Sequence, residues 1–494
     1  MRDASKGIRI LAGVIFLSAH VFAVYAQEQG TPPATYPLSL KEATQLALRN
    51  NFDIQLTKYD TWIARTDKQV AESIYDTMFE AEVEYRNDQS QRTSTILGTK
   101  TVDNDYDVGL SKKLPTGTTL GVDLENNRNF NNAVFATSPL THDSTLGVTV
   151  EQDLGKNIFG IQDRGDIKIT LKDIENAEYT TRRKIEESVR EVQKAYWDLV
   201  LQIENVRIEE AMVAEARKLY ELHQEKLKDG LVEMGEAIAS EANYESRKND
   251  LLLARNEVRA KNNTLRLLLN IEDNVDIEPL EAFDLPESGE ALLPAMQRAF
   301  ANRQDYKKAR NDIDAKDIAL SLKKNNLWPE INLTATLERN GLSDHFKQAV
   351  TQATQEDNPN FFAGLALAFP LENNSAKGEL KAAELEKAKS VVLLKLAERQ
   401  IAVDIADRVR NCNIFRESAV NRQEVARLQS MKLEEEEKQF RYGRSDTDTL
   451  IRFQEDVVRA QSAVAAAIYR YHTALVELRE KEGVLLKEYW EGEL

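Results

Sequence analysis

The 494-residue sequence predicts a mixed α+β membrane protein, in which short amphipathic strands form part of a barrel wall and long helices extend from it into water. Three observations predict this fold class: an exported N-terminus, a duplicated unit, and strands followed by heptad-patterned helices in each copy. Mean hydropathy is −0.50, which excludes a polytopic helical membrane protein with several apolar runs of about 20 residues. The net charge of −17 argues against nucleic acid as the main partner.

Residues 1–26 predict a secretory signal peptide. Basic residues precede an apolar stretch that ends at Val24-Tyr25-Ala26, where the small side chains suit cleavage by signal peptidase. An uncleaved anchor helix is the alternative, although the stretch is short for a membrane span. The only cysteine, Cys412, lies far from this site, so we expect no N-terminal lipid anchor. An exported chain without a second apolar span is expected in the periplasm, the outer membrane or the medium.

Two copies of one unit fill most of the chain. The segment from Ala47 to Ile54 aligns with Ala299 to Tyr306, and Lys226 to Gly230 aligns with Gln439 to Gly443. The first copy carries an insert between about residues 86 and 145. The predicted organisation is a signal peptide at 1–26, an N-terminal linker at 27–38, the first copy at 39–271, a linker at 272–290, the second copy at 291–486 and a C-terminal tail at 487–494.

Each copy opens with two helices and continues with strands. The helices are predicted at 40–49 and 53–75, and at 292–301 and 305–327. Phe79, Ala81, Val83 and Tyr85 alternate with glutamates, and this period of two with one apolar face predicts a strand. The same pattern predicts strands at about 79–86 and 145–154 in the first copy and at about 330–338 and 361–370 in the second. Alternation around Pro115 predicts a further hairpin at about 106–125.

A long helical hairpin closes each copy, at about 160–271 and 375–486. Gly230 and Gly443 end the first helix of each hairpin, since glycine suits the left-handed residue after a helix. Spacings of four and three residues mark the heptad seam of a coiled coil. The seam consists of Ile185, Val189, Val192, Tyr196, Leu199, Ile203 and Val206.

The strands need partners from other chains. Their apolar face has polar residues opposite, as in a barrel wall with lipid outside and water inside. Open sheet edges are not tolerated in lipid, and these strands are too few to enclose a wide lumen. The sequence therefore predicts an oligomeric barrel that long helices continue as a tube. A soluble coiled-coil protein with a small β domain is the alternative.

The order of these elements closely resembles the TolC family of outer-membrane channel proteins, over about residues 38–486. The matching motifs are Leu40-Lys41-Glu42-Ala43, Ala47-Leu48 with Asn50-Asn51, Leu327-Trp328-Pro329, Phe369-Pro370-Leu371, Phe440 with Gly443, and Asp448-Thr449-Leu450. The first copy departs from two of these motifs: Asp76-Thr77-Met78 stands in place of the Trp-Pro pattern, and Asp153-Leu154 stands in place of Pro-Leu.

The resemblance implies a homotrimer with a shared outer-membrane β-barrel and a periplasmic α-helical coiled-coil barrel. It implies a passive exit duct for small molecules or proteins in a tripartite efflux or type I secretion system. The implied partners are a periplasmic adaptor (membrane fusion) protein, an inner-membrane RND or ABC transporter, and outer-membrane lipid. The alternative is a non-channel structural coiled-coil protein of the periplasm or cell surface. Whether the insert adds strands to the wall or forms an extracellular ornament stays open.

The resemblance also implies a constriction at the periplasmic helical turn. Asp448 matches an acidic position there, and Asp446 is a substitute for a second acid that some members carry where this chain has Ile451. In a trimer one aspartate becomes a ring that favours cations, and Arg441 and Arg444 are candidates to bridge it. An ordinary solvated turn residue is the alternative for Asp446. The predicted adaptor-docking tips are Gly230, Leu231, Glu233, Met234, Glu236 and Gly443.

Two of these tip residues, Leu231 and Met234, have a second interpretation, in which they staple the hairpin. No constellation of residues predicts an enzyme, a metal site or a cofactor. The five histidines are scattered, and Cys412 is expected to be a small packed residue within a helix.

Overall fold

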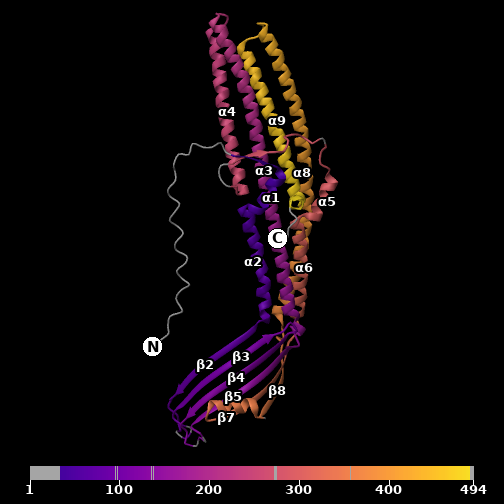
Figure 1. Cartoon of the computed structure of the whole chain (residues 1–494). Helices are drawn as coiled ribbons and strands as arrows, with labels where there is room; N and C mark the ends of the chain where they lie inside the picture. The colour runs from indigo at the N-terminus through magenta and orange to yellow at the C-terminus, as the bar shows by residue number, and fades with distance from the viewer. Residues whose placement is uncertain are drawn as a thin grey trace, which may run out of the picture.

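The computed structural model describes residues 34–489 except 95, 97, 135, 137, 272–274, 287 and 357. The predicted signal peptide at 1–26, residues 27–33 of the predicted linker and residues 490–494 of the tail lie outside the described residues. The molecule is elongated, with a six-stranded sheet at one end and two helical hairpins at the other (Figure 1).

Two short helix pairs begin the copies at mid-length of the molecule. Ser39 caps the first helix, because its hydroxyl accepts from the Glu42 amide while the Glu42 carboxylate accepts from the Ser39 amide. Alanines on this helix are fully buried, which lets it pack closely on the long helix of the same copy. The pairs are α1 (Leu40–Asn50) with α2 (Phe52–Glu72), and α5 (Leu292–Asn302) with α6 (Gln304–Asn325).

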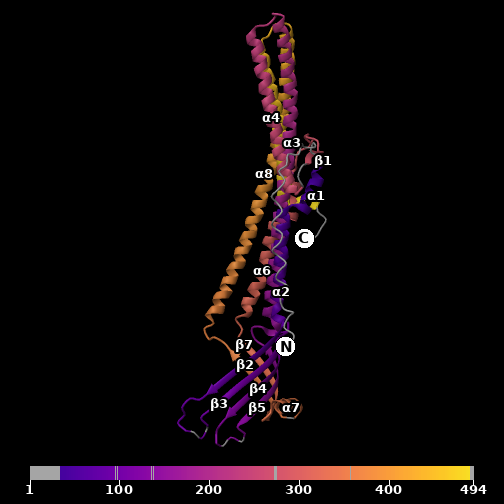
Figure 2. The same cartoon turned by 60° about the vertical axis from the view of Figure 1, so that its left-hand side comes forward.

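The two helical hairpins have matching dimensions. The long helices α3 (Ile161–Lys228) and α8 (Asn374–Arg441) each contain 68 residues, and the return helices α4 (Met234–Leu269) and α9 (Thr447–Glu482) each contain 36. At 1.5 Å per residue a long helix reaches about 100 Å. Helix α3 contacts α4 on one side and α9 on the other, so the hairpins lie side by side (Figures 1 and 2).

None of the helices in the described part of the chain combines the length and the apolar character needed to cross a membrane. The short helix α10 (Leu485–Tyr489) follows α9, and 3₁₀ turns lie at Ser73–Tyr75 and Ile158–Gly160.

The predicted heptad seam holds over only part of α3. Its first five members, from Ile185 to Leu199, are fully buried, whereas Ile203 is 38% exposed. The seam shifts because the neighbours of α3 change: Val192 and Leu199 pack with α1, while residues further along pack with α8 and α9. The buried line then continues through Ile208, Met212, Ala216 and Leu219.

The sheet is antiparallel throughout, with strand order β2-β3-β4-β5-β7-β8. The insert of the first copy supplies β3 and β4, which lie inside the sheet between the flanking strands. The insert therefore adds strands to the wall. The bounds are β2 (Thr77–Asp88), β3 (Thr101–Lys113), β4 (Thr118–Asn131), β5 (Leu140–Asp153), β7 (Glu330–Ser343) and β8 (Pro359–Ala368).

Sequence patterns missed three elements: the strands β1 and β6 in the predicted linkers, and the helix α7 between two strands. Strand β1 (Ala34–Leu38) pairs in parallel with β6 (Val275–Pro279), so the two predicted linkers meet in a small sheet. The Tyr196 hydroxyl donates to the backbone oxygen of Leu38 at 2.9 Å and ties this sheet to α3. Helix α7 (Phe346–Gln355) interrupts the connection between β7 and β8 and packs on β5 and β7.

Candidate functional site

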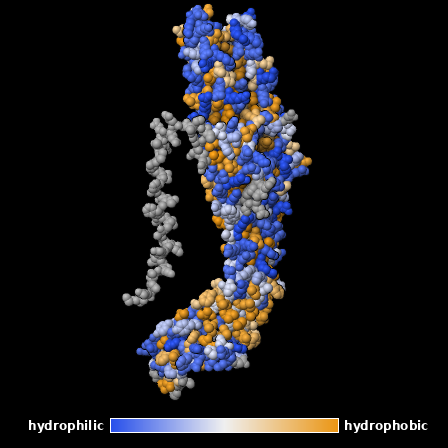
Figure 3. All heavy atoms as spheres, viewed as in Figure 1, coloured by the Kyte–Doolittle hydropathy of each residue, from blue (hydrophilic) through white to orange (hydrophobic). Residues whose placement is uncertain are grey.

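The sheet has one apolar face and one charged face. Directly paired residues of neighbouring strands share a face, so the pairs Phe79–Leu110, Val122–Val148 and Leu337–Phe361 place their side chains on the same side. This apolar face carries many exposed hydrophobic side chains, including Val83 at 73% and Leu365 at 67% exposure. Figure 3 shows an apolar area over the part of the sheet nearest the helices, and more hydrophilic residues towards its far end.

Every aspartate and glutamate of the six strands lies on the opposite face. Glu82 pairs with Asp107, and Asp107 pairs with Glu125, so carboxylates stand beside one another across three strands. The inserted strands supply five of these acids, and this charged lining was not singled out from the sequence. The set is Glu80, Glu82, Glu84, Asp88, Asp103, Asp105, Asp107, Asp123, Glu125, Asp143, Glu151, Asp153, Glu330 and Glu338.

The two turns at the far end of the helices have the same backbone geometry. Gly230 and Gly443 adopt φ of 71° and 69°, the left-handed conformation that glycine tolerates best. The amides of Leu231 and Arg444 donate to carbonyls at the end of the preceding helix, at 2.8 and 2.9 Å. Leu231 is 72% and Met234 is 63% exposed, so neither side chain staples its hairpin.

Asp446 and Asp448 stand in different environments at the second turn. Asp446 is the N-cap of α9: its carboxylate accepts from the Thr449 amide at 2.7 Å and from the Thr449 hydroxyl at 3.1 Å. These bonds hold the pKa of Asp446 below its ordinary value. Asp448 is exposed in the first turn of α9. Asp446 therefore has a structural role, and Asp448 presents its charge to solvent.

The two arginines of this turn are exposed. Arg441 donates through Nε to the backbone oxygen of Glu437 at 3.3 Å. Among the ion pairs of the described residues, none joins Arg441 or Arg444 to Asp446 or Asp448 within one chain. The predicted bridges from Arg441 and Arg444 to a ring of aspartates in a trimer stay a prediction.

The two tips touch each other near their ends. His223 of α3 is fully buried, its Nδ1 lies 3.2 Å from the backbone oxygen of Glu236, and its ring centroid lies 5.9 Å from that of Phe440 in α8. Lys226 lies over the same Phe440 ring, at 5.7 Å. At the first tip Glu233 is exposed and Glu236 is half-buried. The tips are thus held together by one aromatic side chain, which the sequence pattern did not identify.

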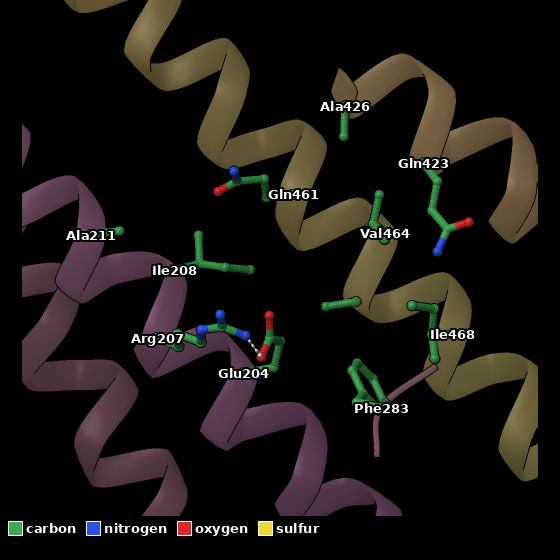
Figure 4. Close-up of a pocket in the computed structure, with 11 residues that line it drawn as sticks. Glu204, Arg207, Ile208, Ala211, Phe283, Gln423, Ala426, Gln461, Val464 and Ile468 are labelled. Atoms are coloured by element: carbon green, nitrogen blue, oxygen red, sulfur yellow. Dashed lines mark hydrogen bonds and ion pairs between the residues drawn. The ribbon is translucent and has the colours of Figure 1, made fainter. Parts of the chain in front are cut away.

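A groove of about 420 Å³ lies between the hairpins further down. Ile208 of α3, Gln423 of α8 and Val464 of α9 line it, and Phe283 closes its lower end (Figure 4). Arg207 and Glu204 form an ion pair of 3.5 Å on its rim. Phe283 lies in the predicted linker, where no periodic pattern marks it as a packing residue.

Solved outer-membrane channels share this architecture. The outer membrane channel CmeC of Campylobacter jejuni aligns with a TM-score of 0.66 at 15% identity, over 90% of this chain and 85% of its own. The MtrE outer membrane channel of Neisseria gonorrhoeae, in its open state, gives 0.66 at 15% identity, over 90% and 88%. VceC of Vibrio cholerae, an outer membrane protein, gives 0.64 at 13% identity, over 90% and 96%. At these identities the likeness establishes the fold.

The sequence itself carries a family signature. Residues 119–270, from β4 to the end of α4, match the profile described as Outer membrane efflux protein. Over these residues the chain is similar to outer membrane efflux proteins, and its fold is that of TolC-like channels. No curated protein matches the sequence significantly. The matched segment and the shared fold support a channel with its sheet in the outer membrane and its helices in the periplasm.

Proposed function

We propose that this chain is a TolC-family channel, which works as a homotrimer and forms the passive exit duct of a tripartite efflux or type I secretion system. The two-faced sheet carries the proposal, since all its acidic residues lie on one face and lipid-compatible residues on the other. Strands β2 and β8 are the open edges. Lipid does not tolerate open edges, so neighbouring subunits must pair there.

Three copies of a six-stranded sheet make an eighteen-stranded barrel. A strand spacing of about 4.8 Å and a tilt of about 40° give such a barrel a diameter on the order of 35 Å. A lumen of this width is water-filled, and its acidic wall slows anions relative to cations. The duct itself has no step that consumes energy, so transport is driven by an inner-membrane RND or ABC transporter.

The periplasmic adaptor protein is proposed to bind the two turns. Leu231 and Met234 are exposed apolar side chains in water, at the tip where an adaptor hairpin would arrive, and burial in a protein interface would stabilise them there. Gly230, Glu233, Glu236 and Gly443 complete this docking tip. The carboxylate of Asp448 is proposed to form the gating ring, with Arg441 and Arg444 of neighbouring subunits as bridging partners.

The gate proposal is tested by single-channel recording in planar bilayers. We expect Asp448→Ala to raise conductance or to weaken the preference for potassium over chloride, because three charges leave the narrowest ring. Glu424→Ala is the control, since Glu424 is exposed on α8 and paired with Arg427 of the same helix. Unchanged currents in Asp448→Ala would remove this residue from the gate.

A structural coiled-coil protein without a pore is the competing hypothesis. This hypothesis does not explain why the sheet exposes an apolar face, which is unfavourable in water. Electrophoresis of the outer-membrane fraction with and without boiling separates the two. We expect a heat-sensitive trimer in that fraction, whereas a soluble monomer would overturn the channel.

A further inference from the structure

The charged side chains on the apolar face of the sheet are all of one sign. No acidic residue of the six strands lies there, and the charged residues that do are all basic: Lys112, Arg128 and Arg339. His142 pairs directly with Arg128 across β4 and β5 and shares this face. A pore lining does not explain this sorting, since these side chains belong to the face turned away from the lumen.

The position of Arg128 marks the outer edge of the lipid-facing band. Leu120, Val122 and Leu124 precede it on the same face of β4. At about 3.4 Å per residue and a tilt of about 40°, the segment from Leu120 to Arg128 rises roughly 20 Å along the membrane normal. Apolar bands of such barrels are about 25 Å tall, so Arg128 lies where the hydrocarbon ends and the lipid headgroups begin.

Helix α7 lies on this same face and at this same level. Ala349 and Ala353 are fully buried, and the backbone of α7 approaches Gly341 of β7 so closely that a side chain there would clash. The ring of Phe346 lies 5.9 Å from that of His142. The side of α7 turned away from the sheet exposes polar residues, namely Lys347, Thr351 and Thr354. Such a side is unfavourable in hydrocarbon and suits the headgroup layer.

We propose that Arg128, His142 and Lys347 form a binding surface for the phosphate-bearing headgroups of outer-leaflet lipid. Arg128 and Lys347 supply the positive charge of this surface: Arg128 pairs directly with His142, and Phe346, the residue before Lys347, places its ring beside His142. An anionic headgroup would neutralise this charge. The acidic residue next to this surface is Asp344, whose Oδ1 lies 2.7 Å from Nδ1 of His345. The chemistry recognised is phosphate, and the source is the membrane, because the surface continues the lipid-facing band.

The inference rests on the outer-membrane placement of the sheet and is tested on the purified full-length protein in detergent. The temperature at which the heat-sensitive oligomer dissociates is measured against added diphosphoryl lipid A, phosphatidylcholine or inorganic phosphate. We expect a saturable rise with diphosphoryl lipid A only. An equal rise with phosphatidylcholine would overturn the headgroup contribution, and a rise with inorganic phosphate alone would overturn the lipid source.

Variants then locate the surface. Combining Arg128→Gln, His142→Gln and Lys347→Gln is expected to raise the half-maximal lipid A concentration at least tenfold. Arg86→Gln is the matched control, because Arg86 carries the same charge on the opposite face of the sheet. If the triple variant forms no oligomer, Lys347→Gln alone, on the exposed side of α7, is expected to give at least a threefold rise. Unchanged lipid binding in the oligomeric variant would overturn the proposal, whereas loss of the wild-type oligomer would concern the proposed channel instead.

Discussion

At the level of single residues, the two aspartates of the second turn have different environments. Sequence alone identified both acids but could not assign them. The Asp446 side chain caps α9, while Asp448 in the next position but one is exposed. An aspartate three residues before a threonine whose amide it accepts is a common helix start, so the cap was predictable from spacing. The proposed gate at Asp448 rests on a short local motif and on the family resemblance that this motif carries.

Removing the N-cap of α9 should lower the stability of the helical tip and leave the proposed ring of Asp448 carboxylates unchanged. We expect Asp446→Ala to make the tip easier to unfold, because the Thr449 amide loses its acceptor. Asp446→Asn should retain most of this stability, since the amide oxygen can still accept. Resistance of the helical tip to limited proteolysis measures the difference. Equal proteolysis of Asp446→Ala and wild type would contradict the capping role.

Glu186 predicts a pH dependence of stability. It is 4% exposed and one of its carboxylate oxygens has no partner, and burial together with the charge of Glu480 raises its pKa from 4.5 to about 8. The folded state therefore favours the protonated acid. Its contribution is fully present below the ordinary pKa of the carboxyl and is lost as pH rises towards 8.

The expected loss between pH 4.5 and pH 7 is roughly 3 kcal/mol. Glu186→Gln should remove this loss, so the variant should be more stable than wild type at pH 7 and nearly equal at pH 4.5. Glu191→Gln, at an exposed position of the same helix, is the control. The midpoint of thermal unfolding across this pH range gives the comparison, and parallel curves for Glu186→Gln and wild type would refute the assignment.

At the level of elements, sequence periodicity predicted the helices and strands that have a regular spacing of apolar residues. The long helices, their glycine ends and the strands around Phe79 and Ile331 follow from spacing alone, and the structure has them. It missed β1 and β6, because each contains five residues and is held by a side chain far along the chain, that of Tyr196. It missed α7 because that helix has only two buried residues, and its close packing depends on Gly341 in another element.

The charged face was visible in part, as alternating glutamates around Phe79. Its extent was not, because the lining forms only when the inserted strands β3 and β4 pair in register with β2 and β5. The inserted strands join the sheet only if they form hydrogen bonds with the neighbouring strands, and a local sequence pattern does not predict which strands pair. The candidate site in the barrel is thus a product of topology, while the candidate gate is a product of local sequence.

The inserted strands should set the ion preference of the barrel. We expect the combined change Asp105→Asn, Asp107→Asn and Asp123→Asn to lower the preference for potassium over chloride, since nine carboxylates would leave the lumen of a trimer. Asn129→Ser, on the same face of β4, is the control because it removes no charge. Reversal potentials in a salt gradient measure the change. An unaltered reversal potential would show that another part of the duct determines the ion preference.

At the level of the whole molecule, the duplicated unit has been modified unequally. The helical hairpins have kept the same lengths in both copies, whereas the first copy contributes four strands to the sheet and the second contributes two. In the proposed trimer the helical tube would therefore keep an even spacing of hairpins, while one copy alone would widen the barrel. The proposed gate at the periplasmic turns belongs to the hairpins, which are the part of the unit that both copies share.

Closure of the barrel between subunits is the final prediction. Strand β2 runs away from the helices and β8 returns towards them, so β8 of one subunit can pair with β2 of the next in the same antiparallel sense as the rest of the sheet. Within one chain these strands are opposite edges of the sheet and cannot be joined by a disulfide. Cysteines placed at both edges should therefore link different subunits.

We expect Glu82→Cys combined with Gly364→Cys or Ala366→Cys, all on the charged face, to give covalent dimers and trimers on oxidation. Each single substitution is the control and should give at most dimers. The native thiol will not interfere, because Cys412 is fully buried and burial raises its pKa to about 12. A covalent ladder that ends at the trimer would fix both the subunit number and an eighteen-stranded wall, and a ladder that continues beyond it, or monomers only for every pair, would contradict the closed threefold barrel.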